Sequence, residues 1–175
     1  MEHLIDAALR AGATKATVIP VEQIVLSADF YKICESNGCG NFGRCWMCPP
    51  FLGDIEELMA KVRSYSHGLL YQTISEIEDS FDIEGMFEAG CRHAQLSQRM
   101  EKEMELPEGH LHLSCGGCRL CERCAKKDDL PCRYPDQALA SMEGYGIDVY
   151  RTTKDTELKY INGANTVTFF GIVLF

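Results

Sequence analysis

NTVTFFGIVLF, residues 165–175, is the most strand-like segment of the chain, because β-branched and aromatic residues fill it. GLLYQTISEI at residues 68–77 has the same character and predicts a second long strand. A further strand is expected over residues 17–26, where Pro20 favours an edge position or the start of the strand. Two shorter strands are expected, at residues 110–113 and 147–150.

Helical patterns occupy much of the sequence between these strands. Residues 1–12 predict a short helix that ends at Gly12. Asp54 followed by Glu57 is the pattern of a capping box, so a helix is expected over residues 55–65. A long helix is expected over residues 81–105, and another over residues 135–143. The long helix has an apolar stripe at i, i+3 and i+4 spacing, made of Ile83, Met86, Phe87, Gly90, Cys91 and Ala94.

Alternation of strands and helices over short links predicts an α/β (α+β) fold, in which one mixed sheet of about four to five strands is flanked by helices. A chain of 175 residues is long enough for one ordinary core, so residues 1–175 are expected to form a single domain. Cysteine-rich loops follow two of the strands, and we expect these loops to meet at one end of the sheet.

The formal charge of −9 argues against nucleic-acid binding, which needs a basic surface to replace counterions. No window is apolar over the length needed to cross a bilayer, and the first residues lack the pattern of a secretory signal. A cytoplasmic protein without a membrane partner is therefore expected. Residues 76–88 carry six carboxylates and no base, which is typical of a solvated helix start and less often of a docking face for a basic partner.

Nine of the ten cysteines fall in two short blocks. Since disulfides are uncommon in the cytosol, clustered thiols there favour metal binding over a disulfide framework. The second block runs Cys115-x2-Cys118-x2-Cys121-x2-Cys124-x7-Cys132. Bacterial ferredoxins use the same x2, x2 run around a [4Fe-4S] cluster, with a remote fourth cysteine. Zinc normally takes two C-x2-C pairs from separate segments, so this block favours a cluster held by Cys118, Cys121, Cys124 and Cys132, with Cys115 as a fifth candidate.

The first block, Cys34-x4-Cys39-x5-Cys45-x2-Cys48-Pro49-Pro50, is looser. Its four thiols predict a second [4Fe-4S] cluster, with zinc as the alternative. Glycines in the block let backbone amides point at the sulfurs, and Trp46, Met47 and Phe51 are expected to exclude water. A remote cysteine sometimes serves the neighbouring cluster, and Cys48 and Cys132 are the candidates for such an exchange.

Several other residues have weaker signals. Cys91 lies on the apolar stripe and is expected to be a small hydrophobe. His110 and His112 share a strand face, where a ligand or proton-relay role is the alternative to solvated side chains. Lys126, Lys127 and Arg133 can offset the negative charge of a cluster, or are ordinary surface residues. No nucleophile–base pair and no dinucleotide or phosphate loop is present, so an enzyme activity is not defined.

The chain resembles the DUF2284 family of small cysteine-rich proteins from anaerobic bacteria and archaea, which are described as predicted metal-binding proteins. The matching residues are Cys34, Gly38-Cys39, Phe42-Gly43 and Cys48-Pro49-Pro50, then Cys118-Arg119-Leu120-Cys121, Cys124-Ala125, Pro131-Cys132-Arg133 and Pro135, and finally Ser141-Met142-Glu143 and Gly146-Ile147-Asp148-Val149. The resemblance implies metal or iron–sulfur binding. Cys45 and Cys115 fall outside the family pattern, and without Cys45 the first site either borrows a thiolate or leaves one iron open.

The sequence therefore predicts an iron–sulfur protein that binds two [4Fe-4S] clusters and passes single electrons to or from a redox partner protein in an anaerobe. The expected cluster ligands are Cys34, Cys39, Cys45, Cys48, Cys118, Cys121, Cys124 and Cys132. One alternative is a structural zinc protein that acts as an interaction module. Another is an iron–sulfur enzyme, or a factor that hands metal or sulfur onward, with an open cluster site.

Overall fold

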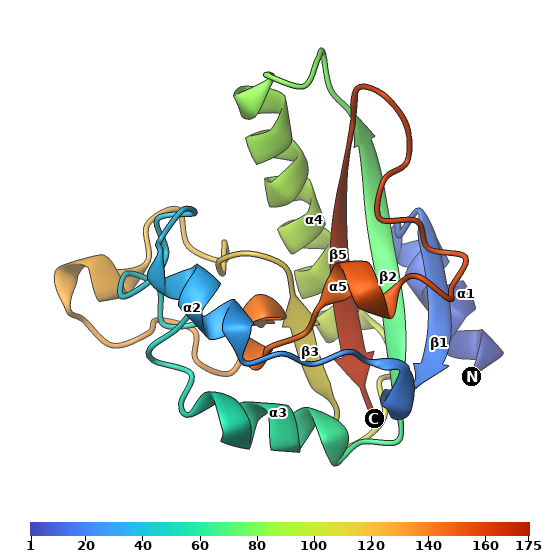
Figure 1. The fold of residues 1–175 in the computed structure, drawn as a ribbon, viewed down its shortest axis with the longest axis horizontal. Coiled ribbons are helices and arrows are strands. Elements are labelled where there is room, and N and C mark those ends of the chain that lie inside the picture. Colours follow the sequence, from blue (N-terminus) through green and yellow to red (C-terminus); the bar gives the residue numbers. More distant parts are fainter.

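A mixed sheet of five strands forms the centre of the fold, in the order β1-β2-β5-β3-β4 (Figure 1). The computed structural model describes all of residues 1–175. Neighbouring strands are antiparallel except for β3 and β4, which are parallel. The strands are β1 (Lys15–Pro20), β2 (His67–Glu76), β3 (Leu111–Ser114), β4 (Ala140–Ser141) and β5 (Thr166–Leu174).

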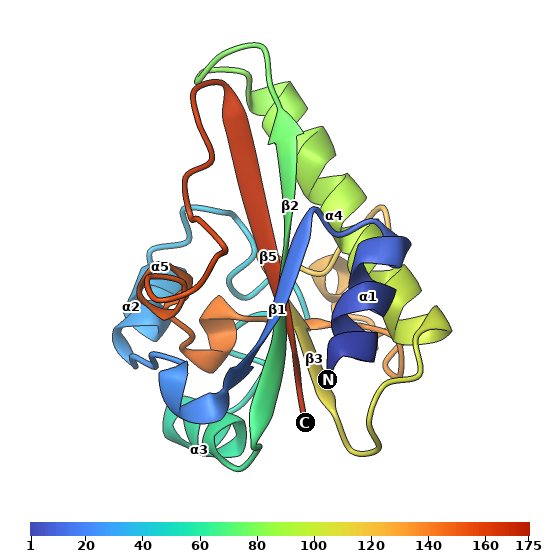
Figure 2. The same cartoon turned by 90° about the vertical axis from the view of Figure 1, so that its right-hand side faces the viewer.

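Helices cover both faces of this sheet (Figure 2). Helices α1 and α4 lie on one face, and α2, α3 and α5 lie on the other. The helices are α1 (Glu2–Ala11), α2 (Asp29–Glu35), α3 (Ile55–Arg63), α4 (Ile83–Glu103) and α5 (Val149–Thr152), and three 3-10 turns are η1 (Val21–Gln23), η2 (Ala125–Asp128) and η3 (Glu143–Tyr145). None of the helices combines the length and the apolar character needed to cross a bilayer.

The two central strands, β2 and β5, are buried on both faces and divide the core in two. Leu69 and Tyr71 of β2 pack in the cluster beneath α1 and α4, whereas Leu70 packs in the cluster on the α3 side. Alternation of side chains along a strand produces this division, because consecutive residues point to opposite faces. Leu70 pairs with Ile172 of β5, which is also fully buried, so one register fixes both halves of the core.

The sequence predicted the fold class and several elements correctly. Helix α1 ends at Gly12, whose φ of 116° lies in the left-handed region that favours glycine. Helix α3 starts at the predicted cap, where the Asp54 carboxylate accepts hydrogen bonds from the backbone N–H groups of Glu56 and Glu57. The strands predicted over residues 68–77, 110–113 and 165–175 correspond to β2, β3 and β5.

Other predictions were wrong. The strand expected over residues 17–26 covers only Lys15–Pro20, and residues 135–143 form turns, β4 and the start of η3 instead of a helix. No strand forms over residues 147–150. Ile147 makes an isolated bridge with Leu26, and Val149 and Tyr150 begin α5, which Asp148 caps by accepting the backbone N–H of Arg151. The short helix α2 was not predicted.

The apolar stripe predicted for α4 is also wrong in its first turns. Ile83 and Phe87 are 77% and 61% exposed, because the buried face of this helix is rotated away from them. That buried face consists of Ala89, Gly90, His93, Leu96, Ser97 and Met100. Two of these residues are polar, which hid the face from a search for apolar periodicity.

Candidate metal centre

Two cysteine-rich loops lie together beside the β3–β4 edge of the sheet (Figure 1). The first loop covers residues 34–54 and begins with Cys34 in the last turn of α2, and the second covers residues 115–139. The indole Nε1–H of Trp46 donates a hydrogen bond of 2.9 Å to the backbone carbonyl of Leu130, which ties the two loops together. The expectation that the two cysteine blocks meet is confirmed.

Five thiols surround one small cavity between the loops, which we call the five-thiol cavity. Four of them come from the second loop, and the fifth, Cys45, reaches in from the first. Trp46 and Met47 form part of the same wall. The cavity has a volume of about 20 Å³. The five thiols belong to Cys45, Cys118, Cys121, Cys124 and Cys132.

Cys45 is the most electrostatically distinct of these thiols. Its side chain is only 2% exposed, yet its pKa is lowered, because the Cys48 thiol and the backbone N–H groups of Met47 and Cys118 interact favourably with the thiolate and outweigh burial. The pKa of Cys48 is raised in return, by its hydrogen bond to Cys45 and by burial. The lowered pKa favours the thiolate form of Cys45, which is the form that binds metal.

A second and larger cavity, which we call the three-thiol cavity, lies on the α2 side of the first loop. The thiols of Cys34, Cys39 and Cys48 line it, together with the carboxyl group of Glu143 from η3. Its volume is about 250 Å³, and no Lys, Arg or His lines it. The apolar part of the wall is formed by Phe30, Ile33, Phe42 and Pro49.

The structure thus separates one cysteine of the first block from the other three. Cys34, Cys39 and Cys48 stay together, whereas Cys45 faces the thiols of the second block. Cys115 lines neither cavity, and burial raises its pKa to about 12. Cys91 on α4 also lies outside both cavities, and its sulfur accepts a hydrogen bond of 3.3 Å from the Arg119 guanidinium.

Basic side chains accompany the five-thiol cavity. Arg133 lines it, and the ammonium group of Lys126 lies 5.0 Å from the ring centroid of Trp46. The ring of Trp46 packs on that of Phe51 at 4.9 Å, so an aromatic layer and a cation cover this side of the loop. These groups supply the local positive charge that was expected near thiolate ligands.

An open cleft of about 490 Å³ runs between the two loops and α4. Arg44, Arg119 and Lys127 lie along it, and Phe87 forms part of its α4 side. Cys91 of α4 also reaches this cleft, together with thiols from both blocks, namely Cys39, Cys45, Cys118, Cys121 and Cys124. The cleft gives solvent or a partner access to the region between the two cavities.

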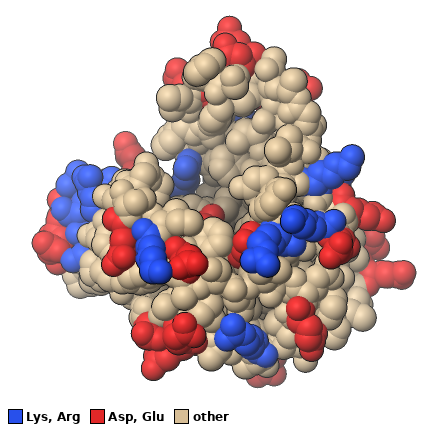
Figure 3. Space-filling model, in the orientation of Figure 1, with Lys and Arg blue, Asp and Glu red and all other residues tan.

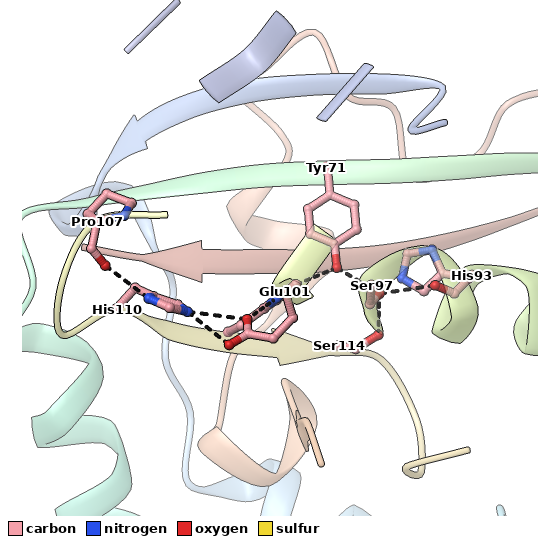
Figure 4. A network of polar contacts seen from close by, with 8 residues as sticks. Tyr71, His93, Ser97, Glu101, Pro107, His110 and Ser114 are labelled. Carbon is pink, nitrogen blue, oxygen red and sulfur yellow. Dashed lines mark hydrogen bonds and ion pairs between the residues drawn. The ribbon is translucent and has the colours of Figure 1, made fainter. Parts of the chain in front are cut away.

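A buried polar network connects the second loop with the surface on the opposite side of β3 (Figure 4). At its outer end the carboxylate of Glu101 contacts Nε2 of His110 at 3.1 Å and Nδ1 of His112 at 2.9 Å. Nε2 of His112 lies 2.7 Å from the hydroxyl of Tyr71, and that hydroxyl donates to Ser97 at 2.7 Å. Ser97 in turn lies 3.1 Å from Ser114, the residue before Cys115.

Burial governs the protonation of this network. Burial raises the pKa of Glu101, but hydrogen bonds from His112 and His110 outweigh it, so the pKa is lowered. Burial lowers the pKa of His112, which is 5% exposed. The two histidines were expected to be solvated or to act as ligands or proton relays. The solvated alternative is wrong for His112, because Tyr71 of β2 and Glu101 of α4 contact its ring and it is buried.

The donor set fits a soft metal. Thiolates select zinc, copper(I) or iron–sulfur clusters rather than magnesium or calcium, and eight thiols line the two cavities. No group of three or more His, Cys, Asp or Glu side chains is arranged so that it could hold one metal ion. The thiols line the walls of two cavities instead.

Comparison with protein families agrees with this donor set. A family model described as a predicted metal-binding protein matches residues 17–175, which include every cysteine. The chain belongs to the DUF2284 family. Searches of curated proteins and of solved structures found no match. The family description thus predicts metal binding for this DUF2284 protein.

Sequence reasoning missed one residue of this DUF2284 centre, the carboxylate of Glu143 in the three-thiol cavity. A signal was present, because Glu143 lies in the stretch Ser141-Met142-Glu143 that resembles the family. The stretch contains no cysteine, so it attracted no chemical interpretation. Spacing alone also gave no reason to separate Cys45 from its own block.

Proposed function

We propose that this DUF2284 protein is an iron–sulfur protein that binds two [4Fe-4S] clusters and transfers single electrons. The observation that supports this most is the number of thiols around the five-thiol cavity. One zinc ion takes at most four ligands in a structural site, whereas five thiols line this cavity and three more line the neighbouring one. Thiols in this number, in two adjacent groups, suit two clusters.

In this proposal, Cys118, Cys121 and Cys124 hold three corners of one cluster and Cys45 holds the fourth. Cys45 is buried between the two loops, whereas Cys132 is only partly buried, so we place Cys45 at the fourth corner. Cys34, Cys39 and Cys48 hold the second cluster. When bound, the clusters supply a site that accepts and releases one electron. Backbone N–H groups near the Cys45 sulfur stabilise negative charge there, which is one way in which proteins tune a reduction potential.

The proposed redox partner docks on the side of the molecule where the cleft opens. Phe81, Ile83 and Phe87 are exposed at the start of α4, which is unusual for three large apolar side chains so close in sequence. Acidic side chains gather at the top of Figure 3, over the turn between β2 and α4 that leads into this helix. A partner with a basic rim and an apolar centre complements this surface.

Anaerobic purification followed by iron, sulfide and zinc quantification tests the proposal. We expect a brown protein with about eight irons and eight sulfides per chain, as two cubanes require. Electron paramagnetic resonance after reduction should show two interacting one-electron centres. Colourless protein that holds stoichiometric zinc, and that takes up no iron when treated with ferrous salt and sulfide, would refute it.

A structural zinc protein is the second candidate function. The small volume of the five-thiol cavity, about 20 Å³, favours it, because a space of this size holds about one water-sized group. The close Cys45–Cys48 pair also has the C-x2-C spacing of a zinc site. In that case zinc removal by a chelator should unfold the two loops, whereas no electron paramagnetic resonance signal should appear on reduction.

A further inference from the structure

The three-thiol cavity carries an unusual balance of charge. Every ionisable group in its wall is an acid, namely the thiols of Cys34, Cys39 and Cys48 and the carboxyl group of Glu143. No basic side chain lines the cavity, and Glu143 forms no ion pair anywhere in the structure. Four acids facing one another without a cation are costly to ionise, so the wall is suited to surround positive charge.

Glu143 is held in this position by both loops and the core. It begins the 3-10 turn η3, which packs against α2, the helix that carries Cys34. Its Oε2 accepts a hydrogen bond of 3.1 Å from the backbone N–H of Gly116, at the start of the second loop. Burial raises the pKa of Glu143, and interactions with its own backbone N–H and with that of Gly116 lower it. Both donors belong to the backbone, which leaves acceptor capacity on the carboxyl oxygens for a ligand in the cavity.

The position of Cys45 leaves the three-thiol cavity with one thiol fewer than the first cysteine block contains. Because Cys45 faces the five-thiol cavity, only three cysteines remain for a centre in the three-thiol cavity. The carboxylate is also close to them, since burial and then the charge of Glu143 raise the pKa of Cys34. A cubane has four metal corners, and three thiolates leave one corner without a protein sulfur.

We propose that Glu143 is the fourth protein ligand of the centre in the three-thiol cavity, and that this oxygen-bound corner is an exchangeable site for a small ligand. This inference rests on the proposed iron–sulfur function. A carboxylate oxygen is a harder donor than a thiolate and holds a thiolate-bound iron less firmly. The cavity has a volume of about 250 Å³, which the cluster and a small exogenous ligand would share.

The exchangeable corner distinguishes the two centres chemically. The ligand that replaces Glu143 faces the apolar side chains of Phe30, Ile33 and Phe42, and it finds no cationic side chain to bind. A small donor molecule without a large anionic group, such as cyanide as a laboratory probe, fits these surroundings. The five-thiol cavity offers no such corner, because its thiols outnumber the corners of a cubane.

Two substitutions of Glu143 test the inference, with Glu122→Gln as the control because Glu122 is an exposed carboxylate in the second loop. Glu143→Gln keeps an acceptor for the Gly116 N–H and removes the charged ligand, and Glu143→Cys replaces the oxygen with a thiolate. Each iron-loaded protein is treated with ferricyanide, which accepts the electron when a [4Fe-4S]²⁺ core loses one Fe²⁺ and one electron and becomes [3Fe-4S]⁺. Circular dichroism monitors the fold.

Wild-type protein and Glu122→Gln should each release one iron per chain and gain the electron paramagnetic resonance signal of one three-iron cluster. Glu143→Gln should lose the corner iron as Fe²⁺ before any oxidant is added, which leaves a [3Fe-4S]⁰ core that ferricyanide then oxidises to [3Fe-4S]⁺. Glu143→Cys should resist ferricyanide. Cyanide should change the spectrum of reduced wild-type protein and leave that of Glu143→Cys unchanged. If all four proteins release iron and respond to cyanide alike, Glu143 is not a ligand while the iron–sulfur function stands. If the wild-type protein contains no iron, both the iron–sulfur function and the role of Glu143 as a ligand are refuted.

Discussion

Protonation of the buried side chain of His93 is expected to make the protein less stable in acid. His93 lies on the inner face of α4 and is 1% exposed. Its Nε2–H donates to the backbone carbonyl of Phe170 at 3.0 Å, and its Nδ1 lies 2.8 Å from the hydroxyl of Thr73. The neutral ring thus satisfies both nitrogens. A second proton would add an unpaired charge in the core.

Burial is the main cause that lowers the pKa of His93 to about 4, and the nearby charges of His112 and Arg119 act in the same direction. In the unfolded chain this pKa is close to 6.5. Between these values the unfolded state binds more protons than the folded state, so the free energy of unfolding falls as the pH falls. The stabilisation that the neutral His93 ring contributes is complete above about pH 6.5 and is lost progressively toward pH 4.

The size of the effect follows from the two pKa values. Each pH unit between them corresponds to about 1.4 kcal/mol, which gives about 3 kcal/mol for full titration and about 2 kcal/mol between pH 7.5 and pH 5. His93→Gln should lose this part of the pH dependence, because its amide can still donate to the Phe170 carbonyl but does not titrate. The free energies of unfolding of both metal-loaded proteins are compared at several pH values under anaerobic conditions by denaturant titration.

Subtraction of the two curves removes contributions that both proteins share, such as those of the thiolates and of His112. The free energy of unfolding of the wild-type protein, minus that of His93→Gln, should therefore fall by about 2 kcal/mol between pH 7.5 and pH 5. His3→Gln is the control, since His3 is exposed on α1 and its replacement should leave the curve parallel to that of the wild type. Parallel curves for His93→Gln as well would contradict the proposed burial of a neutral ring.

Four further substitutions test the site and the core. Cys45→Ser should remove the cluster of the five-thiol cavity, so that iron content falls by about half, whereas Cys132→Ser should leave the iron content nearly unchanged. The opposite result in iron analysis would return the fourth corner to Cys132. Gly171→Ala should destabilise the protein by about 1–3 kcal/mol in denaturant titrations, because the added Cβ would lie 2.2 Å from the ring of Tyr71. A neutral effect would mean that this part of the core rearranges to make room. Tyr71→Phe should cost about 1–3 kcal/mol, because it removes the hydroxyl that contacts Nε2 of His112 and donates to Ser97. Iron content should not change, and a loss of iron would show that the network also supports the second loop.

The parts of the fold that were predictable are those encoded by neighbours in the sequence. Asp54 caps α3 through backbone groups two and three residues away, and Gly12 ends α1 by its own φ angle. The long strands β2 and β5 are apolar on both faces, as central strands are, and this pattern is visible without knowledge of their partners. Such signals need no long-range contact.

The parts that were not predictable depend on contacts between distant segments. Residues 135–143 contain a helical spacing of apolar residues, but Ala140 pairs with Leu113 of β3 and the N–H of Ser141 donates to the carbonyl of Met47. These contacts hold the segment extended where the spacing alone predicts a helix. The polar face of α4 was missed for the same reason, because His93 and Ser97 are buried only through partners on β2, β3 and β5.

The same dependence on distant contacts separates Cys45 from the other thiols of its block. The first loop folds back on itself, with the N–H of Gly43 donating to the carbonyl of Pro49 at 3.0 Å, and Cys45 and Cys48 lie between these two ends. The spacing in the sequence indicates four thiols close together but not the directions in which they point. Only the approach of the second loop, fixed by the contact between Trp46 and Leu130, supplies Cys45 with its four new neighbours.

The contact between Cys45 and Cys48 links the two proposed centres. Cys48 lines the three-thiol cavity and Cys45 lines the five-thiol cavity, yet the two thiols interact directly and only two residues separate them in the chain. A ligand of one centre is thus in contact with a ligand of the other. Under the two proposals, Cys45 would hold one centre and Cys48 the other, and their contact would give an electron a direct route between the two centres.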